Sequence, residues 1–160
     1  DPTDQMRELM PFSALLGMTV QRQTPESVVL TMEWSVERTT VGGVLHGGAL
    51  MSLADSAGAL CAFLNLPEGA AGTTTIESKS NLLGAVRAGS VTAAAHPLHV
   101  GRSTIVVETE LRRDDGKLVA GVGASSAPTG TTPPNSSPRH PDTIVGRDEW
   151  ANLLAGGSAR

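Results

Sequence analysis

The sequence predicts an α+β fold in which an antiparallel β-sheet wraps around one long central helix. Residues 50–64 carry the strongest helical pattern in the chain and few charges, so this helix is expected to be largely buried. Stretches rich in β-forming residues follow it one after another, without intervening helices, which disfavours a parallel doubly wound sheet. At 160 residues, the chain fits one domain of ordinary size.

The elements before the central helix are expected from local patterns. Helical spacing of apolar residues indicates a short helix over residues 4–16, interrupted at Pro11 and stopped at Gly17. Runs of β-forming residues indicate strands over 18–23 and 28–34, and a pair of glycines indicates a loop over 39–44. In the central helix, apolar residues recur at spacings of three and four and so fall on one stripe: Leu50, Leu53, Ala57, Leu60 and Leu64. Pro67 is expected to end this helix.

The second half of the chain reads as strands joined by turns, expected over residues 73–83, 90–100, 103–112 and 118–124. Asp115-Gly116 predicts a hairpin turn, because this pair tolerates positive φ. After Ser125, the composition shifts to Ser, Pro, Thr and Gly, which bury too little apolar surface to offset the entropy of ordering. We therefore expect one domain over residues 1–125. The tail over residues 126–160 is expected to be a flexible linker with a short helix near residues 148–155.

Composition excludes several classes of function. The formal charge of −4, the lack of a basic run and an aromatic content of 2% argue against a nucleic-acid partner. The single cysteine, Cys61, excludes an internal disulfide and a Cys-rich zinc site, suits a reducing cytoplasm, and reads as a buried core residue. No apolar run reaches the ~18 residues of a membrane span, so membrane insertion is not expected. His96, His99 and His140 do not form a metal set, and neither a metal nor a cofactor is expected.

Three residues at the start of the central helix, His46-Gly47-Gly48, form the first candidate site. The first N–H groups of a helix lack intrahelical partners and carry partial positive charge, so they can bind an oxyanion. Glycines there also permit a ligand to approach the backbone closely. On these residues alone, the alternative is equally good: His46 caps the helix and the glycines only relieve crowding.

Asp55 is the second candidate, because it lies in mid-helix among apolar neighbours. A buried carboxylate is costly unless it is hydrogen-bonded or functional. The alternative is that Asp55 faces solvent or is satisfied by Ser52 or Ser56. Asp55 follows His46 by nine residues, which corresponds to about 900° of rotation and about 13–14 Å of rise on a helix. The two side chains then point in opposite directions, so if both act on one substrate they must come from different subunits, which predicts a dimer with composite sites.

At Val44-Leu45-His46-Gly47-Gly48 followed by Asp55, the sequence resembles the PaaI-like, phenylacetate-degradation branch of the hotdog-fold acyl-CoA thioesterases. Three further stretches match family members in the same order: residues 75–83 with 87–89, residues 100–103, and residues 115–120. The resemblance covers about residues 10–125. It implies a hotdog fold and the hydrolysis of acyl-CoA thioesters to free acid and CoA by a homodimer or a dimer of dimers.

The resemblance also implies roles for individual residues. The Gly47 N–H would polarise the thioester carbonyl, His46 would orient the thioester or the attacking group, and Asp55 of the partner subunit would act as general base or nucleophile. Thr75 matches the Ser or Thr that helps to hold the water. Substrate-binding candidates, directed at the acyl-CoA and its phosphates, are Gly48, Gly101, Arg102 and Ser103.

One position departs from the family pattern, since Thr40 stands where some relatives have Asn. Two other functions remain open. A non-catalytic acyl-CoA sensor would bind ligand without turnover, and a hotdog enoyl-thioester hydratase would add water without releasing thiol. The acyl group is not defined by the sequence, because the residues that shape its pocket cannot be paired from one chain.

Overall fold

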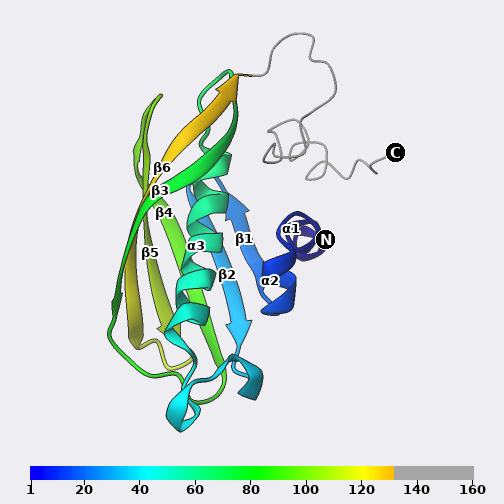
Figure 1. Ribbon diagram of the computed structural model, residues 1–160, viewed down its shortest axis with the longest axis vertical. Helices are drawn as coiled ribbons and strands as arrows, with labels where there is room; N and C mark the ends of the chain where they lie inside the picture. Colours follow the sequence, from blue (N-terminus) through cyan, green and yellow to red (C-terminus); the bar gives the residue numbers. More distant parts are fainter. Residues whose placement is uncertain (132–160) are drawn as a thin grey trace.

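The computed structural model describes residues 1–131, which form one antiparallel sheet of six strands with its helices (Figure 1). The helices are α1 Pro2–Leu9, α2 Pro11–Leu15 and α3 Gly47–Leu64, with 3-10 turns η1 Val36–Arg38 and η2 Val41–Gly43. The strands are β1 Thr19–Thr24, β2 Ser27–Glu33, β3 Ala70–Leu82, β4 Ser90–Val100, β5 Ile105–Arg113 and β6 Leu118–Thr131. Their order across the sheet is β1-β2-β4-β5-β6-β3, so β1 and β3 are the edges.

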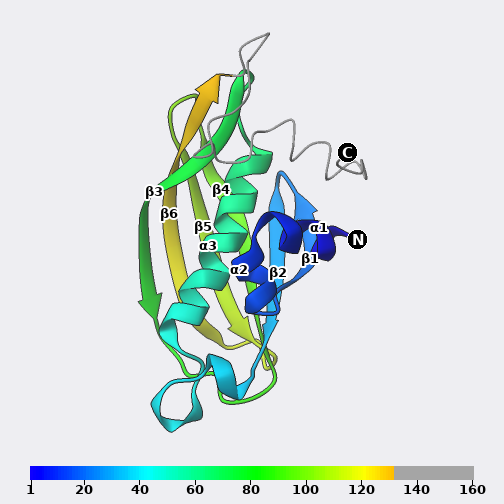
Figure 2. The same cartoon turned by 45° about the vertical axis from the view of Figure 1, so that its right-hand side comes forward.

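The sheet curves around α3, which lies along its inner face in both views (Figures 1 and 2). Inward-facing residues alternate with exposed or half-buried ones along β4 and β5, as expected for a sheet packed on one side. Small side chains on β4, Ala93 and Ala95, are fully buried beneath the helix. Leu53, Ala57 and Leu60 of the predicted stripe are also buried. The predicted architecture of a sheet around one central helix is therefore confirmed.

Helix α3 is apolar on most of its circumference. Its 18 residues have a mean hydropathy of 1.4. By length and composition alone, the helix could cross a membrane, although no apolar run of that length was expected from the sequence. Of this window, 61% is buried inside the structure. Burial within the sheet accounts for the apolar composition, as for any core helix that packs on several sides.

The N-terminal segment forms two helices where one interrupted helix was predicted. The break falls at Met10, since Pro11 opens α2 and the chain changes direction between them. Gly17, at φ +64°, follows the end of α2, as predicted for a helix stop. Helix α2 lies beside the middle of α3 (Figure 2), where Ser13 contacts Ser56.

The last strand is longer than the sequence predicts. The whole of β3 pairs with β6, from Leu82↔Ala120 to Ala70↔Thr131. Residues 126–131 are therefore strand, and their interpretation as a linker was wrong. The backbone hydrogen bonds of a two-stranded ladder do not require apolar side chains, which is why a Ser- and Thr-rich composition misled the prediction. The expected helix over residues 148–155 lies outside the described residues.

Strand β3 is an edge whose middle is open on both faces, because residues 74–79 are all exposed. Its outer side has no partner strand within residues 1–131. Apolar side chains line this region, with 61% of Ile76, 50% of Leu82 and 60% of Leu83 exposed. An unpaired edge with apolar residues is a template for pairing with another chain.

Candidate active site

His46 caps the N-terminus of α3. Its side-chain Nδ1 accepts a hydrogen bond from the Gly48 N–H at 2.8 Å. The backbone N–H of His46 donates to the Arg38 carbonyl at 2.8 Å. With Nδ1 accepting, a neutral imidazole carries its proton on Nε2. The side chain is exposed, and Nε2 makes no hydrogen bond within the described residues. The cap thus holds the ring in one orientation and leaves one N–H donor available.

Both glycines after His46 lie close to neighbouring side chains. A Cβ on Gly47 would lie 2.8 Å from Cδ1 of Leu82, and a Cβ on Gly48 would lie 2.9 Å from Nδ1 of His46. Gly48 therefore lets the imidazole fold back onto the backbone to form the cap. The Gly47 N–H, in the first turn, makes no hydrogen bond within the described residues. This donor at the positive end of the helix suits an oxyanion. The alternative in which His46 caps the helix is therefore confirmed, while the oxyanion site stays a prediction that the unpartnered Gly47 N–H leaves possible.

Asp55 is exposed, so the expectation that it is buried was wrong for the single chain. It was inferred from apolar neighbours in the sequence, but this face of α3 points toward the open edge of the sheet. Thr75 Oγ1 donates a hydrogen bond to Asp55 Oδ1 at 3.4 Å. The pairing of β3 with β6 shifts register between Thr75 and Glu77, so a bulge lies beside this contact. The structure thus brings together Asp55 and Thr75, which are 20 residues apart.

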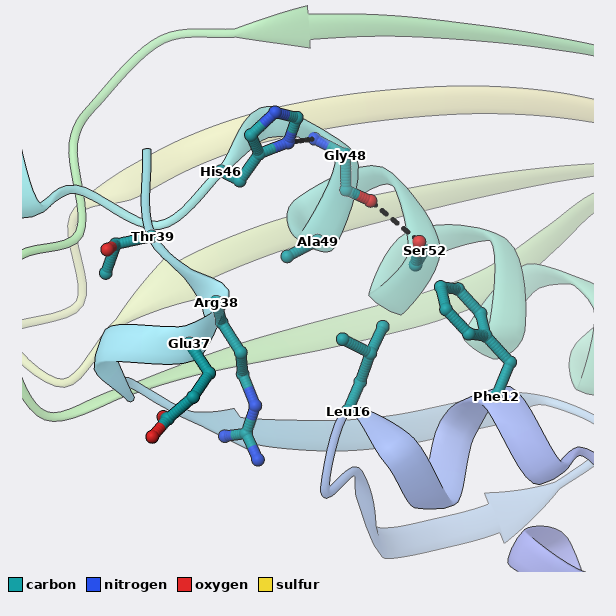
Figure 3. A pocket seen from close by; sticks show the side chains of 9 residues that line it. All are labelled: Phe12, Leu16, Glu37, Arg38, Thr39, His46, Gly48, Ala49 and Ser52. Carbon is teal, nitrogen blue, oxygen red and sulfur yellow. Dashed lines mark hydrogen bonds between the residues drawn. The ribbon is translucent and has the colours of Figure 1, made fainter. Parts of the chain in front are cut away.

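A pocket of about 360 Å³ opens beside the start of α3 (Figure 3). His46 lies at one side of it, and Ser52 Oγ donates to the Gly48 carbonyl at 2.7 Å within its wall. Most of the lining comes from residues that the sequence reading did not select: Phe12, Leu16, Glu37, Arg38, Thr39, Ala49 and Ser52. No local pattern marks them, because they come from α2, the η1 turn and α3, which meet only in the fold.

His46 and Asp55 do not meet within one chain. Helix α3 runs unbroken through Asp55, so the half-turn offset derived from the sequence applies. The pocket is lined by His46 and Gly48 but not by Asp55 or Thr75. A single chain therefore holds the two groups on different faces of one helix, a candidate donor half-site at Gly47 and a candidate carboxylate half-site at Asp55.

The remaining candidates, Gly101, Arg102 and Ser103, lie in the turn between β4 and β5. Arg102 lines a second pocket of about 270 Å³ with Glu68 and Gly69, residues that follow the C-terminal end of α3. Several of its lining residues follow the C-terminal end of α3, whereas His46 caps the N-terminal end of the same helix. Gly101 has a backbone role, since its N–H donates to the Thr104 carbonyl at 2.9 Å.

Arg102 makes no ion pair within the described residues, so its guanidinium is available to an anion. Across residues 1–131, no group of three or more His, Cys, Asp or Glu side chains is placed to hold a metal ion.

Residues 42–120 match the model of a protein family described as the thioesterase superfamily. This range contains all eight candidate residues. Among curated proteins, the chain is 35% identical over 103 residues to "Putative esterase PA1618" of Pseudomonas aeruginosa, covering 64% of this chain and 71% of the relative. It is 32% identical over 117 residues to a "Putative esterase" of Haemophilus influenzae, covering 72% of this chain and 84% of the relative.

Solved structures give the same result. Thioesterase HI1161 from Haemophilus influenzae superposes with a TM-score of 0.71 at 27% identity, over 78% of this chain and 87% of that one. A mutant of thioesterase PA1618 from Pseudomonas aeruginosa superposes with a TM-score of 0.72 at 30% identity, over 78% of this chain and 91% of that one.

Proposed function

This chain belongs to the thioesterase superfamily and has the hotdog fold, and from that premise we propose that it hydrolyses acyl-CoA thioesters to a free acid and CoA. Thioester hydrolysis is the activity that the family implies in general. The observation that carries the finer proposal is the unpartnered Gly47 N–H at the start of α3, beside the capped His46. A carbonyl oxygen that gains negative charge during attack needs such a preorganised donor.

In the proposed reaction, water attacks the thioester carbonyl carbon. The π electrons of the C=O bond move to oxygen, where the Gly47 N–H stabilises the charge. Nε2–H of His46 is a second donor that orients the thioester. When the tetrahedral intermediate collapses, the C–S bond breaks and CoA leaves as a thiolate that takes up a proton. This geometry needs a base to remove the proton from water.

We assign the base to Asp55 of the partner subunit, held by Thr75 on its own chain. As general base, the carboxylate takes the proton of the attacking water. As nucleophile, it attacks the carbonyl itself and forms a mixed anhydride that water then hydrolyses. The two routes differ in a single turnover in ¹⁸O-labelled water with excess enzyme. In the nucleophilic route, water that attacks Cγ of Asp55 in the anhydride puts the label into the Asp55 carboxylate, which mass spectrometry of the peptide measures; the general-base route puts it only into the released acid.

Support for a dimer comes from the open edge at β3. A second copy that pairs its β3 antiparallel to this one, about a two-fold axis, continues the sheet and covers Ile76 and Leu82. The two α3 helices then lie side by side and run in opposite directions. That arrangement brings the start of one helix toward the middle of the other, so Gly47 meets Asp55 of the partner subunit.

We propose that Arg102, with Gly101 and Ser103, contacts the phosphates of CoA, because its guanidinium is exposed and free of ion pairs within residues 1–131. A phosphate-binding arginine acts without altering the chemistry at the carbonyl. Its loss should therefore raise KM more than it lowers kcat. For the compartment, we propose the cytoplasm, which suits the free thiol Cys61.

The first test is thiol release from a panel of acyl-CoA thioesters by the native protein and Asp55→Asn. The substitution keeps the shape of the side chain and removes the base, so we expect a loss of about a hundredfold or more in kcat. The matched control is Asp4→Asn, which removes an exposed carboxylate from α1 and should leave turnover unchanged.

Each other outcome contradicts part of the proposal. Full turnover in a folded Asp55→Asn protein would exclude Asp55 as base or nucleophile while leaving hydrolysis intact. Tight acyl-CoA binding without thiol release from any thioester would indicate a sensor. Hydration of enoyl-CoA without thiol release would indicate a hydratase.

A further inference from the structure

The pocket beside His46 has an apolar wall that comes from α2. Phe12 lies in α2 and Leu16, four residues later, is the C-cap of this short helix, and both face α3 across the pocket (Figure 3). Phe12 keeps 57% of its surface exposed although it is a large apolar residue. Ala49 and Ser52 of α3 form the facing wall. A ligand seated between the two helices would remove the Phe12 ring from water.

Helix α2 is fixed to α3 by a buried polar contact. The hydroxyls of Ser13 and Ser56 are hydrogen-bonded at 3.2 Å, and both residues are buried, with 2% and 9% exposed. The Met18 N–H also donates to the Ser13 carbonyl at 2.9 Å, which anchors the start of β1 to the same residue. A buried hydrogen bond is costly to break, because it leaves unsatisfied groups. The wall that carries Phe12 and Leu16 is therefore held in place before any ligand binds.

The far side of the pocket is charged. Figure 3 shows the guanidinium of Arg38 on the opposite side from His46. Its Nη1 donates to the Glu33 carbonyl at 2.7 Å, which fixes its position, and its Nη2 lies so close to Gly17 that a Cβ there would be 2.5 Å away. An alkyl chain that reached this end would press against a guanidinium and displace its water, which is unfavourable.

We propose that this pocket receives the acyl group of the substrate and that Phe12 and Leu16 restrict it to compact apolar acyl groups. The inference rests on the proposed function, since it takes the thioester carbonyl to lie at Gly47, next to the pocket. A volume of about 360 Å³ is at the small end of ligand pockets. A short alkyl chain or a single aromatic ring fits between α2 and α3, while a long fatty chain meets Arg38.

The test measures binding separately from turnover. Calorimetry of the full-length protein gives the affinities of S-butyl-CoA, S-benzyl-CoA and S-dodecyl-CoA, which are thioethers and cannot be hydrolysed. The native protein should bind the butyl and benzyl compounds more tightly than the dodecyl compound. In Phe12→Ala, the ratio of dodecyl to butyl affinity should rise about tenfold or more, because removing the ring opens the α2 side of the pocket and lets a long chain leave it without reaching Arg38. Leu16→Ala should change this ratio in the same direction.

Leu15→Ala is the matched control, because Leu15 is on the same helix, is 75% exposed and does not line the pocket. It should leave all three affinities unchanged. An unchanged affinity ratio in both Phe12→Ala and Leu16→Ala would overturn the inference, as would a change of oligomeric state in Phe12→Ala, which would mean that Phe12 covers a second copy. Thioether selectivity as expected, in a protein that hydrolyses no thioester, would overturn the proposed function and leave the pocket assignment standing.

Discussion

The residues at the start of α3 combine a structural role with a proposed chemical one. His46 satisfies the Gly48 N–H through Nδ1, which is the ordinary work of a helix cap. The same bond fixes which nitrogen carries the proton, so the cap also prepares a donor. From the sequence alone, a cap and a catalytic group are alternatives for His46, but this side chain forms the cap and is also suited to the proposed catalytic role.

Asp55 illustrates how sequence neighbours mislead about burial. Its neighbours Ala54 and Ser56 are buried, yet Asp55 itself is exposed, since successive helical residues point about 100° apart. The inference that a buried carboxylate must be functional therefore does not hold within one chain. Its contact with Thr75, and the open edge of β3 beside it, now support the proposed role in place of burial.

Cys61 gives a prediction at the residue scale. Its side chain is fully buried, as expected from the sequence, and burial raises the pKa of the thiol to about 11. Because the thiolate is the reactive form, labelling by a thiol reagent at pH 8 should be roughly a hundredfold slower in the native protein than in denaturant. The chain has one cysteine, so the absorbance of the chromophore that the reagent releases on reaction reports the labelling of Cys61 alone.

Labelling should quicken only as the pH approaches 11 or as the protein unfolds, and turnover should survive exposure to the reagent. Rapid native labelling at pH 8 with loss of activity would mean that the thiol is accessible and close to the reacting atoms.

At the scale of elements, α3 is built to be enclosed, and the position of each glycine in it matters. Gly58 lies mid-helix, where a Cβ would meet Thr109 Oγ1 at 3.8 Å and Val107 Cγ1 at 4.0 Å, both ordinary contacts. Gly48 lies in the first turn, where a Cβ would be 2.9 Å from His46 Nδ1. The same substitution at the two sites should therefore have different effects.

Gly58→Ala should raise the free energy of unfolding by about 1 kcal/mol, because alanine loses less backbone entropy in a helix interior. Gly48→Ala should give no such gain, because pushing the imidazole away costs a cap worth about 1 kcal/mol. Urea unfolding at one fixed protein concentration measures both, since unfolding of a dimer depends on concentration. Equal stabilisation by the two substitutions would show that the His46 cap contributes nothing.

The β3–β6 pair shows a limit of composition as a guide. Residues 126–131 contain no large apolar residue, but they complete a ladder with the start of β3. Long-range pairing of this kind depends on where the partner strand begins. That position is not encoded in the local composition of either segment.

At the scale of the whole molecule, we propose that the two candidate half-sites on α3 are complete only in an assembly. The predicted composite site can be tested with two variants that are each expected to be inactive, His46→Ala and Asp55→Asn. A mixed dimer holds one site with both groups intact and one with neither. Equal mixing with free subunit exchange should restore about a quarter of native activity, because half of the dimers are mixed and each has one working site.

The measurement is thiol release before and after exchange, with each variant alone as its own control. No recovery, with mixed dimers present by native mass spectrometry, would place His46 and Asp55 in separate functions or in one chain. Either result bears on the dimer without depending on the acyl group used.

The sequence by itself determined the central helix, the order and most of the bounds of the strands, the turn at Gly116 and the family, because local periodicity and turn chemistry depend on residues close in the chain. It also determined that His46 and Asp55 face apart, since helical geometry is fixed. The PaaI-like branch and the roles of the site residues stay predictions. Only the tertiary structure decided that Asp55 is exposed beside Thr75, that β6 extends to Thr131, and that α2 supplies a pocket wall at His46. These features join segments far apart in the sequence, and their contacts arise only when the sheet closes around the helix.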